Sequence, residues 1–140
     1  MKAVLYNLRK GQNGRRQPDT HVVSMPERNM GEKEMVGKYK VITLCGSTRF
    51  KDAFTETQKR LTLAGNIVIS VGLFGHSGDD EAWTPGTKEM LDDMHKRKID
   101  MADGIFVINV GGYIGESTRS EIAYALCTGK EVHYLEQPAE

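Results

Sequence analysis

Apolar residues over positions 38–140 occur in short runs that alternate with longer stretches in which they recur every three or four residues. The short runs are rich in Val, Ile, Tyr and Phe and are bounded by glycine or polar residues. This length and composition predict buried β-strands. The four runs are Tyr39–Cys45, Asn66–Val71, Gly104–Val110 and Glu131–Leu135.

The longer stretches predict three helices, because their apolar and small residues recur at helical spacing. Gly65 follows the first stretch and is typical of a helix end. Thr84 and Pro85 precede the second and are typical of an N-cap and a first helical residue. The expected helices cover about 50–64, 84–102 and 118–128.

This β-α-β-α-β-α-β order with short connections is typical of a parallel sheet covered by helices. We therefore expect an α/β protein, a Rossmann-like (flavodoxin-like) three-layer sandwich. Its parallel sheet would have four to five strands, with helices on both faces. In such folds ligands bind beyond the carboxyl ends of the strands, where the strand order switches. The loops after the first and third strands are expected to meet there.

Residues 1–37 have a different character, because they are polar, interrupted by Gly and Pro, and only weakly periodic. Such composition is typical of an arm or linker. One interpretation adds a short strand over Ala3–Leu8. We expect a polar N-terminal arm over 1–37, followed by a single α/β domain over 38–140.

Length and composition narrow the class of protein. A chain of 140 residues with 39% apolar residues is long enough for one globular domain. No run approaches the roughly 18 apolar residues of a membrane-spanning helix. The N-terminus also lacks the long apolar run and cleavage site of a signal peptide. We expect no membrane association and a cytoplasmic location, with the two cysteines as thiols.

The charges balance, with 19 Lys and Arg against 19 Asp and Glu. Nucleic-acid-binding domains are usually basic, so we expect a small-molecule substrate and no nucleic-acid polymer as partner. The balance conceals an asymmetry. Positions 1–37 carry seven basic and four acidic residues, whereas positions 38–140 carry twelve and fifteen.

The loop after the first expected strand, Gly46-Ser47-Thr48-Arg49, is suited to binding an anion. Glycine lets a ligand approach the backbone closely, and the start of a helix presents free N–H groups. The two hydroxyls and the guanidinium of Arg49 add donors. A simple helix cap at Ser47 or Thr48 is the structural alternative, but it does not account for Arg49. The loop matches neither the Walker pattern nor GxGxxG.

A glycine-rich loop after the third expected strand leads into a helix that carries Glu121 in its expected first turn. The helix dipole there favours an ionised carboxylate by about 0.3–1 kcal/mol. Such a carboxylate suits a nucleophile, or a group that stabilises a cationic sugar-like transition state. Thr118 and Glu121 also match the capping box. From the residues alone, the cap is the favoured interpretation.

Asp92 and His95 lie one turn apart on the middle helix, and His95 shares an apolar stripe with Leu91 and Ile99. His95 should therefore face the body of the domain. An Asp–His pair can donate or accept a proton near neutral pH. A buried histidine beside a surface acid is the structural alternative, and it is the more common arrangement.

The loop between the second strand and the second helix matches no metal-ligand spacing, so we expect no metal and no cofactor. Trp83 in this loop either belongs to a lid that stacks on a base or anchors the core. Cys45 and Cys127 are expected to be small buried residues rather than nucleophiles. The potential ligands considered were His76, Asp79, Asp80 and Glu81.

Residues 40–136 resemble the nucleoside 2-deoxyribosyltransferase superfamily, which includes 2′-deoxynucleoside 5′-monophosphate N-glycosidases. Three motifs carry the resemblance. They are the Gly46-Ser47-x-Arg49 loop, the Met-Ala-Asp-Gly-Ile-Phe-Val segment at 101–107, and the Glu-Ile-Ala-Tyr-Ala-Leu helix segment at 121–126. The resemblance implies a small Rossmann-like sheet with a phosphate-binding loop after its first strand.

The resemblance implies that Glu121 is the nucleophile that attacks the anomeric carbon of the sugar. The family's acid, an Asp on the middle helix, falls at His95 here, so either Asp92 or His95 protonates the departing base. Ser117 and Ser120 are implied as helper donors. The expected substrate- and phosphate-binding residues are Gly46, Ser47, Thr48, Arg49, Gly112, Ser117 and Ser120.

We therefore expect an enzyme, a hydrolase or a transferase, that cleaves or exchanges the N-glycosidic bond of a deoxynucleoside or its 5′-monophosphate. A non-catalytic nucleotide-binding or sensor module is one alternative. A ribonucleotide phosphoribohydrolase on the same fold is the other, because the loop at 111–116 is also similar to the PGGxGTxxE loop of the "lonely guy" phosphoribohydrolases. The resemblance further implies a homo-oligomer.

Overall fold

The computed structural model describes residues 4–5, 8–10, 16–18, 23–24 and 36–138. They divide into two units, Met1–Lys38 and Tyr39–Glu140. In the first unit, β1 (Val4–Leu5) pairs with β4 (Val23–Ser24), and β2 (Leu8–Lys10) pairs with β3 (Arg16–Pro18), both antiparallel. The single strand expected over Ala3–Leu8 lies partly outside the described residues, and its described part belongs to two strands, β1 and β2.

The second unit contains one sheet of four parallel strands in the order β6-β5-β7-β8. Three helices connect them, so the predicted α/β Rossmann-like fold is confirmed. The strands are β5 (Val41–Gly46), β6 (Ile67–Ile69), β7 (Gly104–Ile108) and β8 (Glu131–Tyr134). The helices are α1 (Lys51–Leu63), α2 (Thr87–Asp100) and α3 (Glu116–Cys127), with 3₁₀ turns η1 (Gly75–Ser77), η2 (Asp80–Trp83) and η3 (Val110–Gly112).

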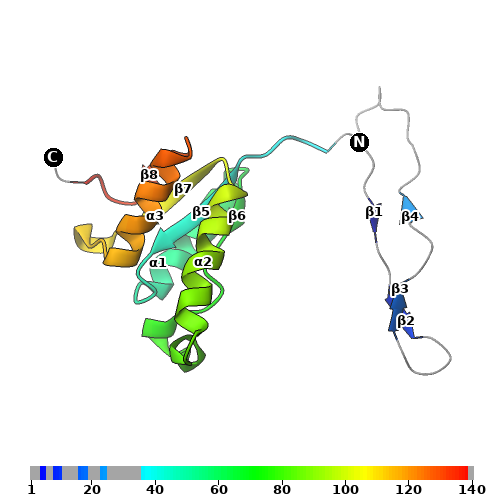
Figure 1. Cartoon of the computed structure of the whole chain (residues 1–140). Coiled ribbons are helices and arrows are strands. Elements are labelled where there is room, and N and C mark those ends of the chain that lie inside the picture. The colour runs from blue at the N-terminus through cyan, green and yellow to red at the C-terminus, as the bar shows by residue number, and fades with distance from the viewer. Residues whose placement is uncertain (1–3, 6–7, 11–15, 19–22, 25–35, 139–140) are drawn as a thin grey trace. The chain divides into compact units, whose positions relative to one another are not determined.

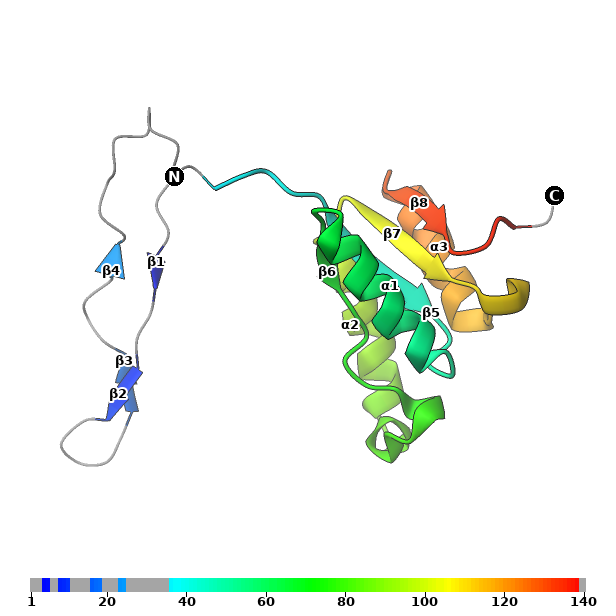
Figure 2. The same ribbon diagram turned by 180° about the vertical axis from the view of Figure 1, so that it is seen from behind.

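Helices cover both faces of this sheet, as Figures 1 and 2 show from opposite sides. On one face, Phe54 of α1 packs with Leu44 and Ile108 of the sheet. On the other face, Ile99 of α2 and Ala125 of α3 pack with sheet residues that include Val107. All six side chains are fully buried. Successive side chains of a strand point to opposite faces, so each central strand contributes to both cores.

Of two predicted strand properties, one is wrong and the other is confirmed. The run at Asn66–Val71 was expected to be a buried strand, but β6 is an edge strand and Ile67 is 50% exposed. In contrast, β5 and β7 are neighbours, as the predicted switch in strand order requires. The loops that follow these two strands therefore leave the sheet side by side.

All three helix starts differ from the sequence predictions. Phe50 stands at the N-cap of α1 and makes no side-chain cap, so neither Ser47 nor Thr48 caps this helix. Gly86, in a left-handed conformation, stands at the N-cap of α2. Thr84 is the C-cap of η2 and Pro85 lies in the turn that follows, so neither starts the helix.

The third helix begins at Glu116, two residues earlier than expected, with Gly115 at the N-cap. Thr118 and Glu121 therefore cannot form a capping box, and Glu121 lies in the second turn of α3. The prediction that Glu121 serves mainly as a helix cap is wrong. The glycine-rich loop is shorter than its sequence suggested, because helical residues extend further toward it.

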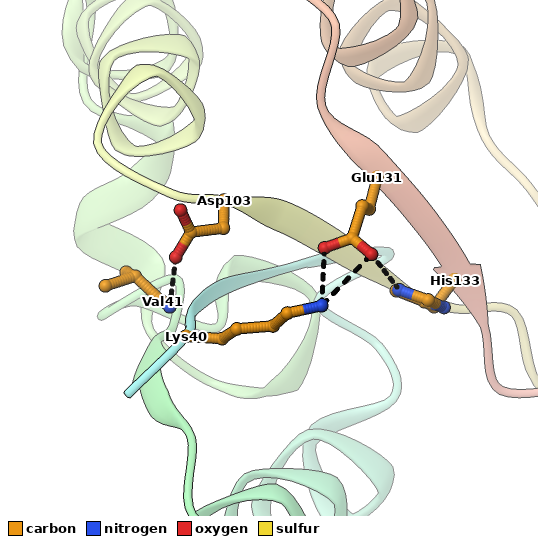
Figure 3. Close-up of polar contacts among 5 residues, drawn as sticks. All are labelled: Lys40, Val41, Asp103, Glu131 and His133. Carbon is orange, nitrogen blue, oxygen red and sulfur yellow. Dashed lines mark hydrogen bonds and ion pairs between the residues drawn. The ribbon is translucent and has the colours of Figure 1, made fainter. Parts of the chain in front are cut away.

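The amino ends of the strands are joined by exposed polar contacts (Figure 3). Lys40 forms an ion pair with Glu131 of β8, with Nζ–Oε2 at 2.9 Å. Glu131 also lies 3.8 Å from Nε2 of His133. A carboxylate oxygen of Asp103 accepts a hydrogen bond from the backbone N–H of Val41 at 2.8 Å. Lys40 therefore links the start of β5 to β8, and Asp103 links the start of β7 to β5, at the end of the sheet opposite the cavity described below.

Among the described residues, no helix combines the length and the apolar character that crossing a membrane requires. This finding agrees with the sequence-based expectation as far as a spanning helix is concerned.

Candidate functional site

A cavity of about 430 Å³ opens at the carboxyl end of the sheet. Its wall is built by the loop after β5, the segment between β6 and α2, the inner face of α2 and the first turns of α3. A volume in this range suits a small organic ligand. The location is the one that the switch in strand order predicts.

The cavity brings together eight of the ten predicted site residues and leaves out two. Gly112 lies in η3 and Ser120 on the outer side of α3, and both are exposed. Their predicted contact with a ligand is therefore not supported by the geometry of the cavity. The eight that line the wall are Gly46, Ser47, Thr48, Arg49, Asp92, His95, Ser117 and Glu121.

The Arg49 side chain is positioned by two neighbours. Its Nε donates a hydrogen bond to the hydroxyl of Ser47 at 3.0 Å. Its guanidinium lies 4.5 Å from the ring centroid of Tyr113 and is 3.4 Å from the phenolic oxygen. Stacking of a guanidinium on an aromatic ring fixes its plane and leaves its other donors available. Tyr113 was not predicted as a site residue, and no spacing in the sequence pointed to it.

Gly46 is required by the packing of the sheet. A Cβ at this position would lie 2.8 Å from the carbonyl oxygen of Ile108 on the neighbouring strand. The glycine was attributed to close approach of a ligand, but contact between β5 and β7 already accounts for it. Thr48 is linked to the opposite wall, since its hydroxyl lies 2.9 Å from Nδ1 of His76.

Trp83 forms part of the cavity wall beside His76. The two rings pack edge to face with centroids 4.9 Å apart, and the indole N–H donates to the carbonyl of Gly75 at 3.1 Å. Trp83 is 48% exposed, so its interpretation as a core anchor is wrong. Ala82 is the residue of η2 that is buried instead.

Three polar side chains meet at the base of the cavity, where β5 ends. Cys45 is fully buried, and His95 and Glu121 are 6% and 8% exposed. The Cys45 Sγ atom lies 3.3 Å from Nε2 of His95, and that nitrogen lies 3.8 Å from Oε1 of Glu121. The prediction of a small buried residue is confirmed for Cys45 and wrong for Cys127, which is exposed. The contact of Cys45 with the two predicted catalytic residues was not anticipated.

Burial dominates the protonation of this group. Burial, followed by the negative charge of Asp92, raises the pKa of Glu121 from 4.5 to about 7. Burial lowers the pKa of His95 from 6.5 to about 4, with an added contribution from the charge of Lys98. Burial also raises the pKa of the Cys45 thiol well above its usual value, and the charge of Glu121 adds to this. Near neutral pH His95 is neutral, so its contact with Glu121 is not an ion pair.

Asp92 differs from Glu121 in its surroundings. It lines the cavity and lies 2.7 Å from Nζ of Lys88 in an ion pair whose side chains are about half exposed. The pairing raises the pKa of Lys88. Lys88 and Asp92 stand four residues apart on α2, a spacing that is readable from the sequence as a helix-surface ion pair. Two carboxyl groups of unlike environment thus share one cavity.

The fold and cavity together define the class: a Rossmann-like α/β protein with a ligand-sized cavity at the carboxyl end of its parallel sheet. Within that class, the cavity combines a buried carboxyl group with a guanidinium. A scan against protein-family models found no match for this chain, and a search of curated proteins found no significant match.

Proposed function

We propose that this protein cleaves or exchanges the N-glycosidic bond of a deoxynucleoside or its 5′-monophosphate, with Glu121 as the nucleophile. The observation that carries the proposal is the buried carboxyl group of Glu121 in the same cavity as Ser47 and Arg49. A carboxylate can attack the anomeric carbon of a sugar, and a guanidinium together with a hydroxyl can bind a phosphate. The resemblance to the deoxyribosyltransferase superfamily points to the same roles.

In this reaction the ionised Glu121 oxygen attacks the anomeric carbon, a C–O bond forms, and the C–N bond to the base breaks. The base leaves with the bonding electron pair and takes a proton. Water then releases the sugar in a hydrolase, and a second base does so in a transferase. Because Glu121 is desolvated, its carboxylate is less stabilised by water and more reactive than an exposed one.

Asp92 and His95 are the two candidates for the group that protonates the departing base. His95 holds the position of the family's acid, but its pKa of about 4 leaves almost no imidazolium near neutral pH. Asp92 lines the same cavity and its charge acts on Glu121. We assign His95 the role of a neutral neighbour, with Nε2 at 3.3 Å from the Cys45 thiol and 3.8 Å from the Glu121 carboxyl group.

The phosphate of a monophosphate substrate would be bound by Arg49 with the Ser47 hydroxyl. The Arg49 side chain is exposed, and its stacking on the Tyr113 ring orients the guanidinium before a ligand binds. Binding energy from this remote group can be used at the reacting bond. A preference for monophosphates over nucleosides would follow.

The test is chromatography of free base released from a panel of deoxynucleosides, ribonucleosides and their 5′-monophosphates, with and without a second base. We expect Glu121→Gln to lower base release by at least about 10³-fold, because the amide cannot form the covalent bond. Glu131→Gln, at the opposite edge of the sheet, is the matched control and should leave the rate unchanged. Arg49→Ala should remove any preference for monophosphates.

Base release by Glu121→Gln at the wild-type rate would overturn the assignment of the nucleophile, provided circular dichroism shows both proteins folded. Preference for ribonucleotides would favour a phosphoribohydrolase instead. A new nucleoside in the presence of the second base would identify a transferase.

A non-catalytic nucleotide-binding module is favoured by one observation, namely that a neutral, buried His95 stands where the family has an acid. This alternative requires that nucleotides raise the melting temperature without base release. Ligand at a hundredfold over its dissociation constant would add about 2.7 kcal/mol of stability. The proposal also includes a homo-oligomer, on the strength of the resemblance, and a cytoplasmic location, on the strength of the sequence pattern.

A further inference from the structure

The cluster at the base of the cavity has the composition of a metal site. It combines a thiol, an imidazole and a carboxyl group, which are the ligand types that Zn²⁺ prefers. Within the described part of the chain, Cys45, His95 and Glu121 are the group of potential ligands whose donor atoms all lie within 4.8 Å of one another. All three are buried, which distinguishes them from an exposed acidic cluster.

The spacing of the donor atoms fits tetrahedral coordination. With the usual Zn–S, Zn–N and Zn–O bond lengths, a tetrahedron separates its ligand atoms by about 3.3–3.6 Å. The observed separations are 3.3 Å between Cys45 Sγ and His95 Nε2, and 3.8 Å from that nitrogen to Glu121 Oε1. The third separation, between Cys45 Sγ and the Glu121 carboxyl group, is no more than 4.8 Å, so closing all three around one ion needs a movement of about 1 Å or less.

The histidine is held with the correct nitrogen forward. Nε2 faces Cys45 and Glu121, and His95 also has a hydrogen bond with the backbone of Leu44. A second bond of this kind orients metal-binding histidines and fixes their tautomer.

We propose that Cys45, His95 and Glu121 bind one zinc ion, with water at the fourth position on the side of the cavity. His95 and Glu121 line the cavity, which gives the ion a path of entry. Three protein ligands and one open position are the arrangement of an accessible zinc site, whereas closed structural sites use four protein ligands.

Binding of zinc conserves both charge and protons. The incoming hydrated ion loses water, and the Cys45 thiol and the protonated fraction of Glu121 release their protons to solvent. Thiolate and carboxylate then neutralise the two charges of the ion. The lysines whose charges reach this cluster, Lys88, Lys96 and Lys98, oppose the cation, and the charge of Asp92 favours it.

This proposal does not depend on the proposed function, because binding of zinc needs no nucleotide. If both hold, zinc on the Glu121 oxygen removes the nucleophile, so base release falls when zinc is added and returns with a chelator. The site would then make the enzyme sensitive to free zinc.

The experiment is a titration of the full chain, freed of metal by a chelator, with Co²⁺ as a coloured probe and then with Zn²⁺ as competitor. We expect one equivalent of Co²⁺ to produce a thiolate-to-cobalt charge-transfer absorption, and Zn²⁺ to displace it. Cys45→Ser should abolish this absorption, whereas Cys127→Ser, at the exposed cysteine, should keep it.

The histidine is tested in the same way. Loss of a residue that hydrogen-bonds to a zinc ligand lowers zinc affinity about 10–100-fold, so loss of the ligand itself in His95→Gln should lower it at least about 100-fold. His133→Gln, in the exposed histidine–glutamate pair, should change nothing. Circular dichroism establishes that each variant folds. The Co²⁺ absorption of the wild-type protein tests the site even if a variant fails to fold.

Either of two results would overturn the site. The first is wild-type protein that shows no thiolate-to-cobalt absorption with excess Co²⁺. The second is absorption that survives in Cys45→Ser and disappears in Cys127→Ser, which would assign the metal to the exposed cysteine. Since no nucleotide is present, neither result bears on the glycosidase proposal.

Discussion

Two histidine–glutamate pairs stand at opposite edges of the same sheet, and each has Nε2 of the histidine 3.8 Å from Oε1 of the glutamate. At the amino edge, the side chains of His133 and Glu131 are 52% and 45% exposed (Figure 3). At the carboxyl edge, those of His95 and Glu121 are only 8% and 10% exposed. The pairs are alike in chemistry and separation and differ in access to water.

The difference shows that solvent access, more than the distance between the partners, makes the carboxyl edge chemically special. Water solvates each charge of an exposed pair, and such pairs contribute little to stability. At the carboxyl edge burial penalises both charged forms, so the pKa of Glu121 rises and that of His95 falls. A carboxyl group there titrates near neutral pH, where an enzyme can use either form.

The largest expected difference between the two edges is in the pH dependence of stability. Because the pKa of Glu121 is raised from 4.5 to about 7, its contribution to stability is fully present below pH 4.5 and lost as the pH rises through about 7. Glu121→Gln does not titrate and should gain up to about 3 kcal/mol on the wild type over this range. Urea unfolding at a series of pH values, with chelator present, measures this gain.

The control for this measurement is Glu131→Gln, which removes an exposed carboxyl group and should change the free energy of unfolding only slightly, because water screens its ion pair. His95 acts in the opposite direction, since its contribution is present above pH 6.5 and lost as the pH falls through about 4. It is present in the wild type and in both variants, so it cancels in the comparison. A Glu121→Gln difference that does not change with pH would show that this carboxyl group is not desolvated.

The second-largest expected effect is the loss of stability when a side chain is added to Gly46 or Gly104, each of which lies close to a neighbouring strand. A Cβ at Gly46 would meet the carbonyl oxygen of Ile108 at 2.8 Å, and one at Gly104 would meet the backbone of Glu131 at 2.9 Å. We expect Gly46→Ala and Gly104→Ala to cost about 2 kcal/mol each through overpacking, as measured by thermal unfolding. Gly115→Ala meets only the flexible end of Tyr113, at 3.4 Å, and should cost less than about 1 kcal/mol. Equal costs at all three positions would contradict the argument.

The smallest effect concerns the exposed ion pairs. Lys40 pairs with Glu131 at the amino edge and Lys88 with Asp92 at the carboxyl edge, at 2.9 and 2.7 Å. Lys40→Ala and Lys88→Ala should each cost about 0.5 kcal/mol or less, because water screens both pairs. Unfolding in low and high salt provides the measurement, and the cost should disappear in high salt. A cost above about 1.5 kcal/mol in either variant would mean that its pair is shielded from solvent.

Much of the site could be predicted because it depends on local pattern. The alternation of apolar runs predicted the parallel sheet, and the adjacency of the loops after β5 and β7 followed from its topology. The apolar stripe on α2 correctly predicted that His95 faces the body of the domain. The start of α3 could not be placed in this way, because Thr118 and Glu121 match a capping box whose geometry the chain does not adopt.

Local pattern by itself determined the order of strands and helices and the loops that carry the polar groups. Only the tertiary structure decided that Cys45, His95 and Glu121 meet. They come from one strand and two helices, and Cys45 and His95 are 50 residues apart in the chain. It also decided which carboxyl group is desolvated. Hydrophobic periodicity is a property of neighbouring residues, whereas removal of water from a side chain depends on everything that packs around it.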